Sequence, residues 1–195
     1  TEWLRNEVAL SAKTVVADVG AGTGLSTVPL LELGCTVYAV EPNEPMRLAM
    51  QQSLSAYPTF TAVAATAEAT SLPDPSVDVV FAGQAFHWFD QEKARVEWQR
   101  ILRFEQSKVI LVWNIRLEDT RFLQRYKQLL IDLGTDYQRV THENLDDAKI
   151  RAFFSSCDRV VFTNAQHFDF DGLLGRALSS SYVPQPGHPN YEPFV

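Results

Sequence analysis

The chain has 195 residues, of which 46% are apolar and 21% charged, a composition typical of one globular domain. Its net charge of −7 argues against nucleic acids or anionic membranes as partners, because both need a basic protein face. No apolar run approaches the length of a bilayer span. Two cysteines are too few for a disulfide framework, and the first residues do not resemble a secretory leader. We therefore expect a cytoplasmic protein.

Five short segments rich in Val, Ile, Phe and Ala predict strands that are buried on both faces, because most lack a period-two alternation. These segments are Thr14–Val19, Thr36–Val40, Phe60–Ala64, Val77–Ala82 and Lys108–Ile115. Helical spacing separates them, and Asn43 is placed to cap a helix that carries Pro45 in its first turn. Alternating strands and helices predict parallel strands with crossover helices. The fold class is therefore α/β, a doubly wound, mostly parallel sheet flanked by helices.

Two further predictions concern a proline within a helix and the secondary structure after residue 115. Pro29 falls inside the first predicted helix, where it is expected to remove a backbone hydrogen bond. After residue 115 the pattern predicts an amphipathic helix over Phe122–Leu133 and a sixth strand over Arg159–Phe168. An open sheet normally ends on a protected edge, so we expect the sheet to lack its last strand in this chain.

The strongest local signal runs from Asp18 to Gly24, where the first predicted strand turns into a helix. Glycines there let the backbone approach a ligand, and the following helix offers free N–H groups. An ordinary tight turn is the alternative. The dinucleotide fingerprint needs G-x-G-x-x-G, whereas Gly20, Gly22 and Gly24 follow G-x-G-x-G. Asp18 would repel a pyrophosphate but suits an ammonium group, so the pattern favours S-adenosylmethionine over NAD.

Over residues 10–115 the sequence resembles the class I S-adenosylmethionine-dependent methyltransferases, which implies a Rossmann-like sheet. In that family an acidic residue after the second strand holds the ribose, the role that Glu41 would take here. A carboxylate can accept from both hydroxyls of a diol, and a solvated surface acid is the alternative. The resemblance places the cofactor against Asp18, Gly20, Ala21, Gly22, Gly24, Glu41, Pro42, Met46, Ala67, Glu68 and Gln84. Met46 would lie against adenine, and a core methionine is its alternative.

The run from Gln84 to Asp90 lacks the Asn/Asp-Pro-Pro-aromatic motif of nucleic-acid amino-methyltransferases. It resembles instead the trans-aconitate-methyltransferase-like group of the type 11 methyltransferase domain. This implies a small-molecule acceptor, with Gln84 near the methionine end of the cofactor and with Phe86 and Trp88 walling the acceptor pocket. His87 is the candidate catalytic base for an alcohol or carbon acid. Plain packing of these aromatic residues is the alternative.

The chemical class of the acceptor is indicated by arginines that lie close together in an otherwise acidic chain. Arg116 follows the fifth predicted strand, and Arg121, Arg125 and Arg139 come soon after it. A guanidinium fork suits a carboxylate, so Arg116 is our candidate substrate residue and a carboxylate is a candidate acceptor. The alternative is that these arginines line the outer face of the helix. The remaining histidines lack ligand spacing, so no metal site is expected.

Together these features predict one methyltransferase domain over residues 1–195, with a cofactor-binding core at 10–115 and a substrate-side region at 116–195. The expected activity is methyl transfer from S-adenosylmethionine to a small molecule, without nucleic-acid or membrane partners. A non-enzymatic S-adenosylmethionine-binding module is the first alternative. A nicotinamide-dependent oxidoreductase is the second. The sequence does not indicate the oligomeric state.

Overall fold

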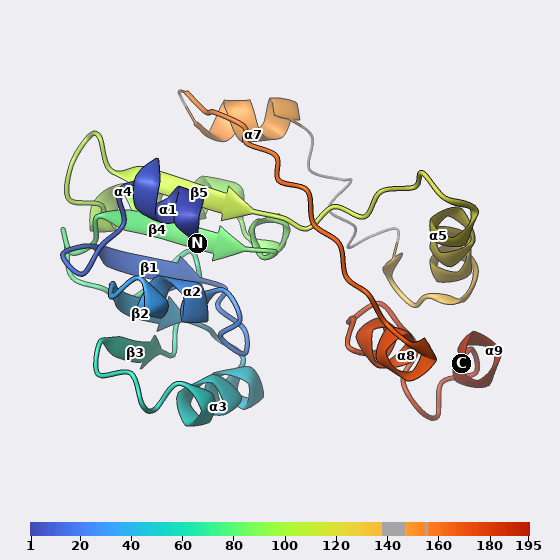
Figure 1. Cartoon of the computed structure of the whole chain (residues 1–195). Coiled ribbons are helices and arrows are strands. Elements are labelled where there is room, and N and C mark those ends of the chain that lie inside the picture. Colours follow the sequence, from blue (N-terminus) through green and yellow to red (C-terminus); the bar gives the residue numbers. More distant parts are fainter. Residues whose placement is uncertain (138–146, 155) are drawn as a thin grey trace. The chain divides into compact units, whose positions relative to one another are not determined.

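The computed structural model describes residues 1–137, 147–154 and 156–195. The chain forms two compact units, Thr1–Asn114 and Ile115–Val195, which we call the N-terminal and C-terminal units (Figure 1).

The N-terminal unit is built on a parallel five-stranded sheet with the strand order β3-β2-β1-β4-β5 (Figure 1). The strands are β1 (Val15–Val19), β2 (Thr36–Val40), β3 (Phe60–Val63), β4 (Val79–Gly83) and β5 (Lys108–Val112). All five predicted segments form strands, and the α/β fold class is confirmed. The order reverses between β1 and β4, and in doubly wound sheets such a reversal opens a ligand-binding crevice at the carboxyl ends of the strands.

Helices cover this sheet. They are α1 (Glu2–Asn6), α2 (Thr27–Glu32), α3 (Glu44–Ser53) and α4 (Gln91–Ile101), with a short 3-10 turn, η1 (Phe86–Trp88), before α4. One face of the sheet packs Val16 and Phe81 against Leu30 of α2 and Met50 of α3. The alternate side chains of β1, such as Ala17, are buried as well, which explains why the strands read as continuous apolar runs.

Of the predictions for individual helix residues, the cap at Asn43 is confirmed and the effect of Pro29 is not. Asn43 accepts a hydrogen bond from the Met46 N–H at 3.1 Å and caps α3 as predicted. The buried apolar face of α4 is formed by Ala94, Trp98 and Ile101. The expectation for Pro29 was wrong, because this residue is the third of α2, and the first four N–H groups of a helix have no intrahelical partner to lose.

The described part of the C-terminal unit contains α5 (Arg121–Leu133), α7 (Asp147–Phe153), α8 (Phe170–Leu178) and α9 (Tyr191–Phe194). The predicted amphipathic helix is confirmed as α5, whose Leu130 packs with Ala177, Val183 and Phe194 in a small core. The predicted strand over Arg159–Phe168 is wrong, because these residues are exposed and pair with no strand among the residues described. A β-rich composition is not sufficient without a partner strand. No helix in the described part of the chain could span a bilayer.

Candidate functional site

The glycine loop after β1 adopts backbone conformations that favour glycine. Gly20, Gly22 and Gly24 have φ angles of 71°, 58° and 91°, in the left-handed region that L-residues avoid. A Cβ on Gly20 would lie 2.6 Å from the Cβ of Ala85, and one on Gly24 would lie 2.9 Å from Met50. A Cβ on Gly22 would meet nothing within 4 Å. Gly20 and Gly24 therefore serve close packing, whereas Gly22 faces open space.

Glu41 lies beside this open space at the end of β2. Its Oε2 accepts a hydrogen bond from the Gly22 N–H at 2.8 Å, and its Oε1 accepts one from the Asn43 N–H at 2.8 Å. The residue is only 7% exposed, so it is not a solvated surface acid, whereas the adjacent Pro42 is exposed. A carboxylate offers about four acceptor sites, and two remain here for donors of a ligand.

Asp18 is fully buried near the end of β1. Its Oδ2 accepts hydrogen bonds from the Ser26 hydroxyl at 2.9 Å and the Thr27 hydroxyl at 2.7 Å. Its Oδ1 has no hydrogen-bond partner among the described residues. Burial raises the pKa of Asp18 from 3.8 to about 6, although the two hydroxyls oppose this rise. A buried carboxylate of this kind is stabilised by a nearby cation.

The run after β4 separates into buried and exposed side chains. Gln84 is exposed and has a φ of 59°, an uncommon conformation for a residue with a Cβ. Trp88 is 56% exposed, and its ring centroid lies 5.1 Å from that of His87. Phe86 is fully buried, with its ring centroid 5.9 Å from Trp98. The expectation that Phe86 walls an acceptor pocket is therefore at odds with the structure, in which this ring supports η1 from the core.

The residues expected on the adenosine side lie in two segments. Met46 on α3 is 46% exposed, so the alternative of a core methionine does not hold. Ala67 is buried, and its carbonyl accepts a hydrogen bond from Trp98 Nε1 at 3.1 Å. Glu68 is half-buried, and its Oε1 accepts one from the Asp90 N–H at 2.9 Å. The segment after β3 is thus tied to the start and middle of α4.

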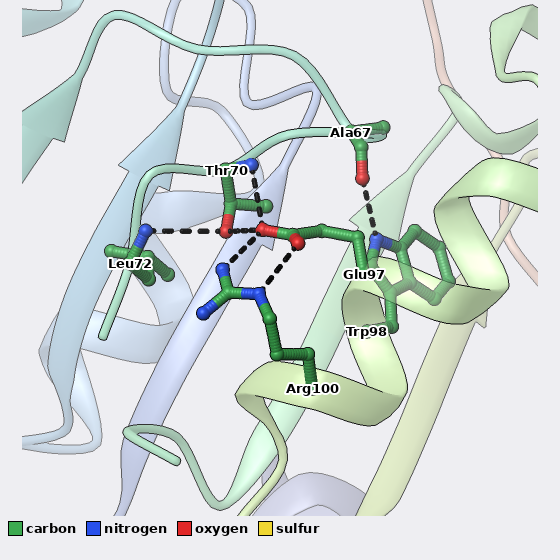
Figure 2. A network of polar contacts seen from close by, with 6 residues as sticks. All are labelled: Ala67, Thr70, Leu72, Glu97, Trp98 and Arg100. Carbon is green, nitrogen blue, oxygen red and sulfur yellow. Dashed lines mark hydrogen bonds and ion pairs between the residues drawn. The ribbon is translucent and has the colours of Figure 1, made fainter. Parts of the chain in front are cut away.

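A polar network centred on Glu97 was not predicted from the sequence (Figure 2). The Oε1 of Glu97 accepts hydrogen bonds from the N–H of Thr70, at 2.8 Å, and from the Thr70 hydroxyl. Arg100 donates to both carboxylate oxygens, through Nε at 2.8 Å and Nη2 at 2.7 Å. One feature of the sequence could have indicated this network, because Glu97 lies beside Trp98 on a helix face that is otherwise apolar. Charged residues are seldom buried unless they are paired, so a buried Glu97 implies a partner.

Arg116 belongs to the C-terminal unit. Its guanidinium lies 4.4 Å from the centroid of the Tyr126 ring, within the range of a cation–π interaction. No carboxylate among the described residues forms an ion pair with it. Arg121 and Arg125 are exposed on α5, as the alternative of an outer helix face expected. Arg139 lies outside the described residues.

Comparison with known proteins gives a consistent result. Residues 17–107 match the family described as Methyltransferase domain. An uncharacterized methyltransferase of Schizosaccharomyces pombe is 32% identical over 178 residues, which cover 89% of this chain and 67% of the relative. An uncharacterized methyltransferase of Mycobacterium bovis is 38% identical over 115 residues, which cover 59% of this chain and 46% of the relative.

Among solved structures, a putative methyltransferase from an antibiotic biosynthesis pathway of Anabaena variabilis is similar, with a TM-score of 0.54 and 34% identity. The match covers 67% of this chain and 53% of that one. The chain thus spans about half the length of the Mycobacterium bovis relative and of the Anabaena variabilis protein, and two thirds of the yeast relative. It belongs to the methyltransferase family.

Proposed function

We propose that this chain binds S-adenosylmethionine at the carboxyl ends of β1 and β2 and transfers its methyl group to a small-molecule acceptor. The observation that carries this proposal is the open space over Gly22, beside a Glu41 carboxylate that retains acceptor capacity. Family membership implies the cofactor, and the residues present fit it.

The fit follows from the chemistry of the groups. S-Adenosylmethionine carries a ribose diol, an ammonium group and a sulfonium methyl, and when bound it supplies that methyl in activated form. Glu41 accepts from the ribose hydroxyls with the acceptor sites that Gly22 and Asn43 leave unused. Asp18 supplies negative charge toward the ammonium end, because its Oδ1 has no hydrogen-bond partner in the described structure. Gln84 would hold the methionine portion, and Met46, Ala67 and Glu68 would hold the adenosine.

Methyl transfer places few demands on acid–base groups. The acceptor lone pair forms the new bond to carbon while the electron pair of the breaking bond goes to sulfur. Orientation and exclusion of water lower such a barrier by about 7–11 kcal/mol. In this proposal the exposed ring of Trp88 shields the acceptor. His87 acts as a base only where the acceptor is an alcohol or a carbon acid.

The acceptor class proposed here is a small carboxylate. Two observations support it. The run from Gln84 to Asp90 resembles the trans-aconitate-methyltransferase-like group, and Arg116 has a guanidinium that no described carboxylate neutralises. An ionised carboxylate needs no base at neutral pH. The activity test is the formation of S-adenosylhomocysteine from S-adenosylmethionine with a panel of mono-, di- and tricarboxylic acids, with matched alcohols as controls. Turnover of the acids alone supports this class, and turnover of the alcohols alone overturns it.

Replacing Glu41 by alanine is expected to weaken binding of S-adenosylhomocysteine by about 1.5–3 kcal/mol, or 10- to 150-fold. The substitution removes the acceptor for the ribose and also the anchor of the Gly22 N–H. Isothermal titration calorimetry measures the effect. Glu32→Ala removes the same charge from an exposed position of α2 and should leave the dissociation constant unchanged. Equal affinity in the two variants would contradict the role of Glu41.

Replacing Gln84 by glycine is expected to raise the stability of the protein while it weakens binding of the cofactor. Glycine relieves the cost of a φ of 59°, so the free energy of unfolding should rise by about 0.5–1 kcal/mol. Binding of S-adenosylhomocysteine should weaken, because the side chain that reaches the methionine portion is lost. Urea denaturation and calorimetry give the two quantities.

The control for Gln84 is Ala9→Gly. Ala9 has a φ of 64° and lines a shallow pocket with Thr14, Asp78 and Lys108, at the amino ends of the strands. This variant should gain similar stability with unchanged affinity. A Gln84→Gly variant that binds as tightly as the wild type would remove Gln84 from the cofactor site.

A further inference from the structure

The segment that joins β3 to β4 contains Ala67 and Glu68, and side chains from α4 hold it (Figure 2). Trp98 Nε1 donates to the Ala67 carbonyl at 3.1 Å. Three residues further on, the N–H and hydroxyl of Thr70 both donate to Glu97 Oε1. Thr70 and Glu97 are buried, at 0% and 8% exposure. The segment is a turn closed by one backbone bond, from the Ala69 N–H to the Thr66 carbonyl at 3.4 Å. It belongs to no helix or continuous strand, so the contacts from α4 are what tie it to the rest of the unit.

Glu97 is ionised in this setting. Hydrogen bonds from Arg100, followed by those from Thr70, lower the pKa of Glu97 to about 2 against an opposing effect of burial. Placing a charge on the buried face of a helix is costly, and an apolar side chain of similar size would pack there as well or better. The methyl-transfer chemistry described above does not use this carboxylate. Its contacts with Thr70 are what an apolar residue could not provide.

We propose that Glu97 is a positioning residue for the cofactor: by fixing Thr70 it holds Ala67 and Glu68 in the conformation that receives the adenosine. This inference rests on the proposed function. A segment already ordered before binding loses less conformational entropy when the ligand arrives. Release of Thr70 therefore lowers affinity even though Glu97 itself does not touch the ligand.

The segment that Glu97 holds through Thr70 also contacts the start of α4, near the residues expected on the acceptor side of the site. Glu68 Oε1 accepts the N–H of Asp90, and Asp90 caps α4 through a bond from the Lys93 N–H at 3.2 Å. Asp90 follows η1 by two residues. Fixing Glu68 thus fixes the start of α4 just after Trp88, so that one set of contacts aligns both sides of the site.

The experiment compares Glu97→Ala with Asp78→Ala, a control variant that loses the same kinds of contact at another place in the N-terminal unit. Asp78 accepts the N–H of Val15 at 2.8 Å and pairs with Arg103 at 3.0 Å, at the amino ends of the strands. The dissociation constant of S-adenosylhomocysteine is measured by calorimetry at a temperature where circular dichroism shows the variants to be folded. Both variants should lose stability, but only Glu97→Ala should raise the dissociation constant, by about tenfold or more.

Thr70→Val supplies a milder variant, because it keeps the side-chain shape and the Thr70 N–H and removes only the hydroxyl, which donates to Glu97 and accepts from the Leu72 N–H at 3.4 Å. It should raise the dissociation constant several-fold and the KM for S-adenosylmethionine in parallel. An unchanged constant in Thr70→Val, or equal constants in Glu97→Ala and Asp78→Ala, overturns the positioning role. Failure of the wild-type protein to bind overturns the proposed function and this inference together, whereas wild-type binding with unaffected variants overturns the inference alone.

Discussion

Replacing Gly22 by valine is expected to abolish binding of S-adenosylmethionine while the N-terminal unit remains folded. The space next to Gly22 is open to 4 Å around an added Cβ, so the new side chain meets no protein atom at first contact and occupies ligand space instead. The φ of 58° adds a backbone cost of about 1–2 kcal/mol for a residue with a side chain. Circular dichroism and urea denaturation measure this loss of stability, and calorimetry measures the loss of binding.

Gly187→Val is the matched control. Gly187 has a φ of 93°, and an added Cβ there would also meet nothing within 4 Å. It belongs to the C-terminal unit, outside the glycine loop. We expect a similar backbone cost with unchanged affinity for S-adenosylmethionine. If the Gly22→Val protein bound the cofactor as tightly as the wild type, the ligand could not lie over this glycine.

Replacing Asp18 by asparagine is expected to change the pH dependence of stability. The pKa of Asp18 is about 6 in the folded protein against 3.8 for an ordinary aspartate. The folded state therefore holds its proton more tightly than the unfolded state between these values, and wild-type stability falls as the pH rises from about 4 to 6. The shift corresponds to a cost of about 3 kcal/mol above pH 6. Asparagine carries no charge and escapes this loss.

Urea denaturation at pH 4 and pH 8 tests this expectation. The difference in unfolding free energy between wild type and Asp18→Asn should shift by about 3 kcal/mol in favour of the variant at pH 8. Affinity for S-adenosylhomocysteine should move the opposite way, since the variant lacks the charge for the ammonium group. Asp136→Asn, at an exposed position of the C-terminal unit, should leave the affinity unchanged. A pH-independent difference for Asp18→Asn would mean that this carboxylate is not held in its raised-pKa state.

The sheet could be predicted because its central strands β1, β2 and β4 are mostly buried on both faces and so appear as apolar runs. Glu41 was expected to act with the glycine loop because of the resemblance to methyltransferases, and the structure brings the two together through the bond from the Gly22 N–H to Glu41 Oε2 at 2.8 Å. The strand predicted over Arg159–Phe168 failed because composition does not reveal whether a partner strand exists. Pro29 was misjudged because a sequence does not fix where a helix begins, and at the third position proline is tolerated.

The candidate site was harder to read in its details. Phe86 and Trp88 are two residues apart, and only the 3-10 turn decides that the first is buried and the second exposed. The sequence suggested a charge role for Asp18 but not its complete burial, from which the raised pKa follows. The hydrogen bonds from Thr70 to Glu97 join residues that are 27 positions apart, so no local sequence pattern could reveal that Thr70 is the partner of Glu97.

The most direct test of cofactor binding is thermal unfolding of the purified chain alone, with S-adenosylhomocysteine and with NAD. A ligand present at one hundred times its dissociation constant adds about 2.7 kcal/mol of stability, which for this size raises Tm by about 5–11 °C. We expect such a rise with S-adenosylhomocysteine and none with NAD. A rise with NAD and none with S-adenosylhomocysteine would contradict the assignment of the glycine loop to S-adenosylmethionine.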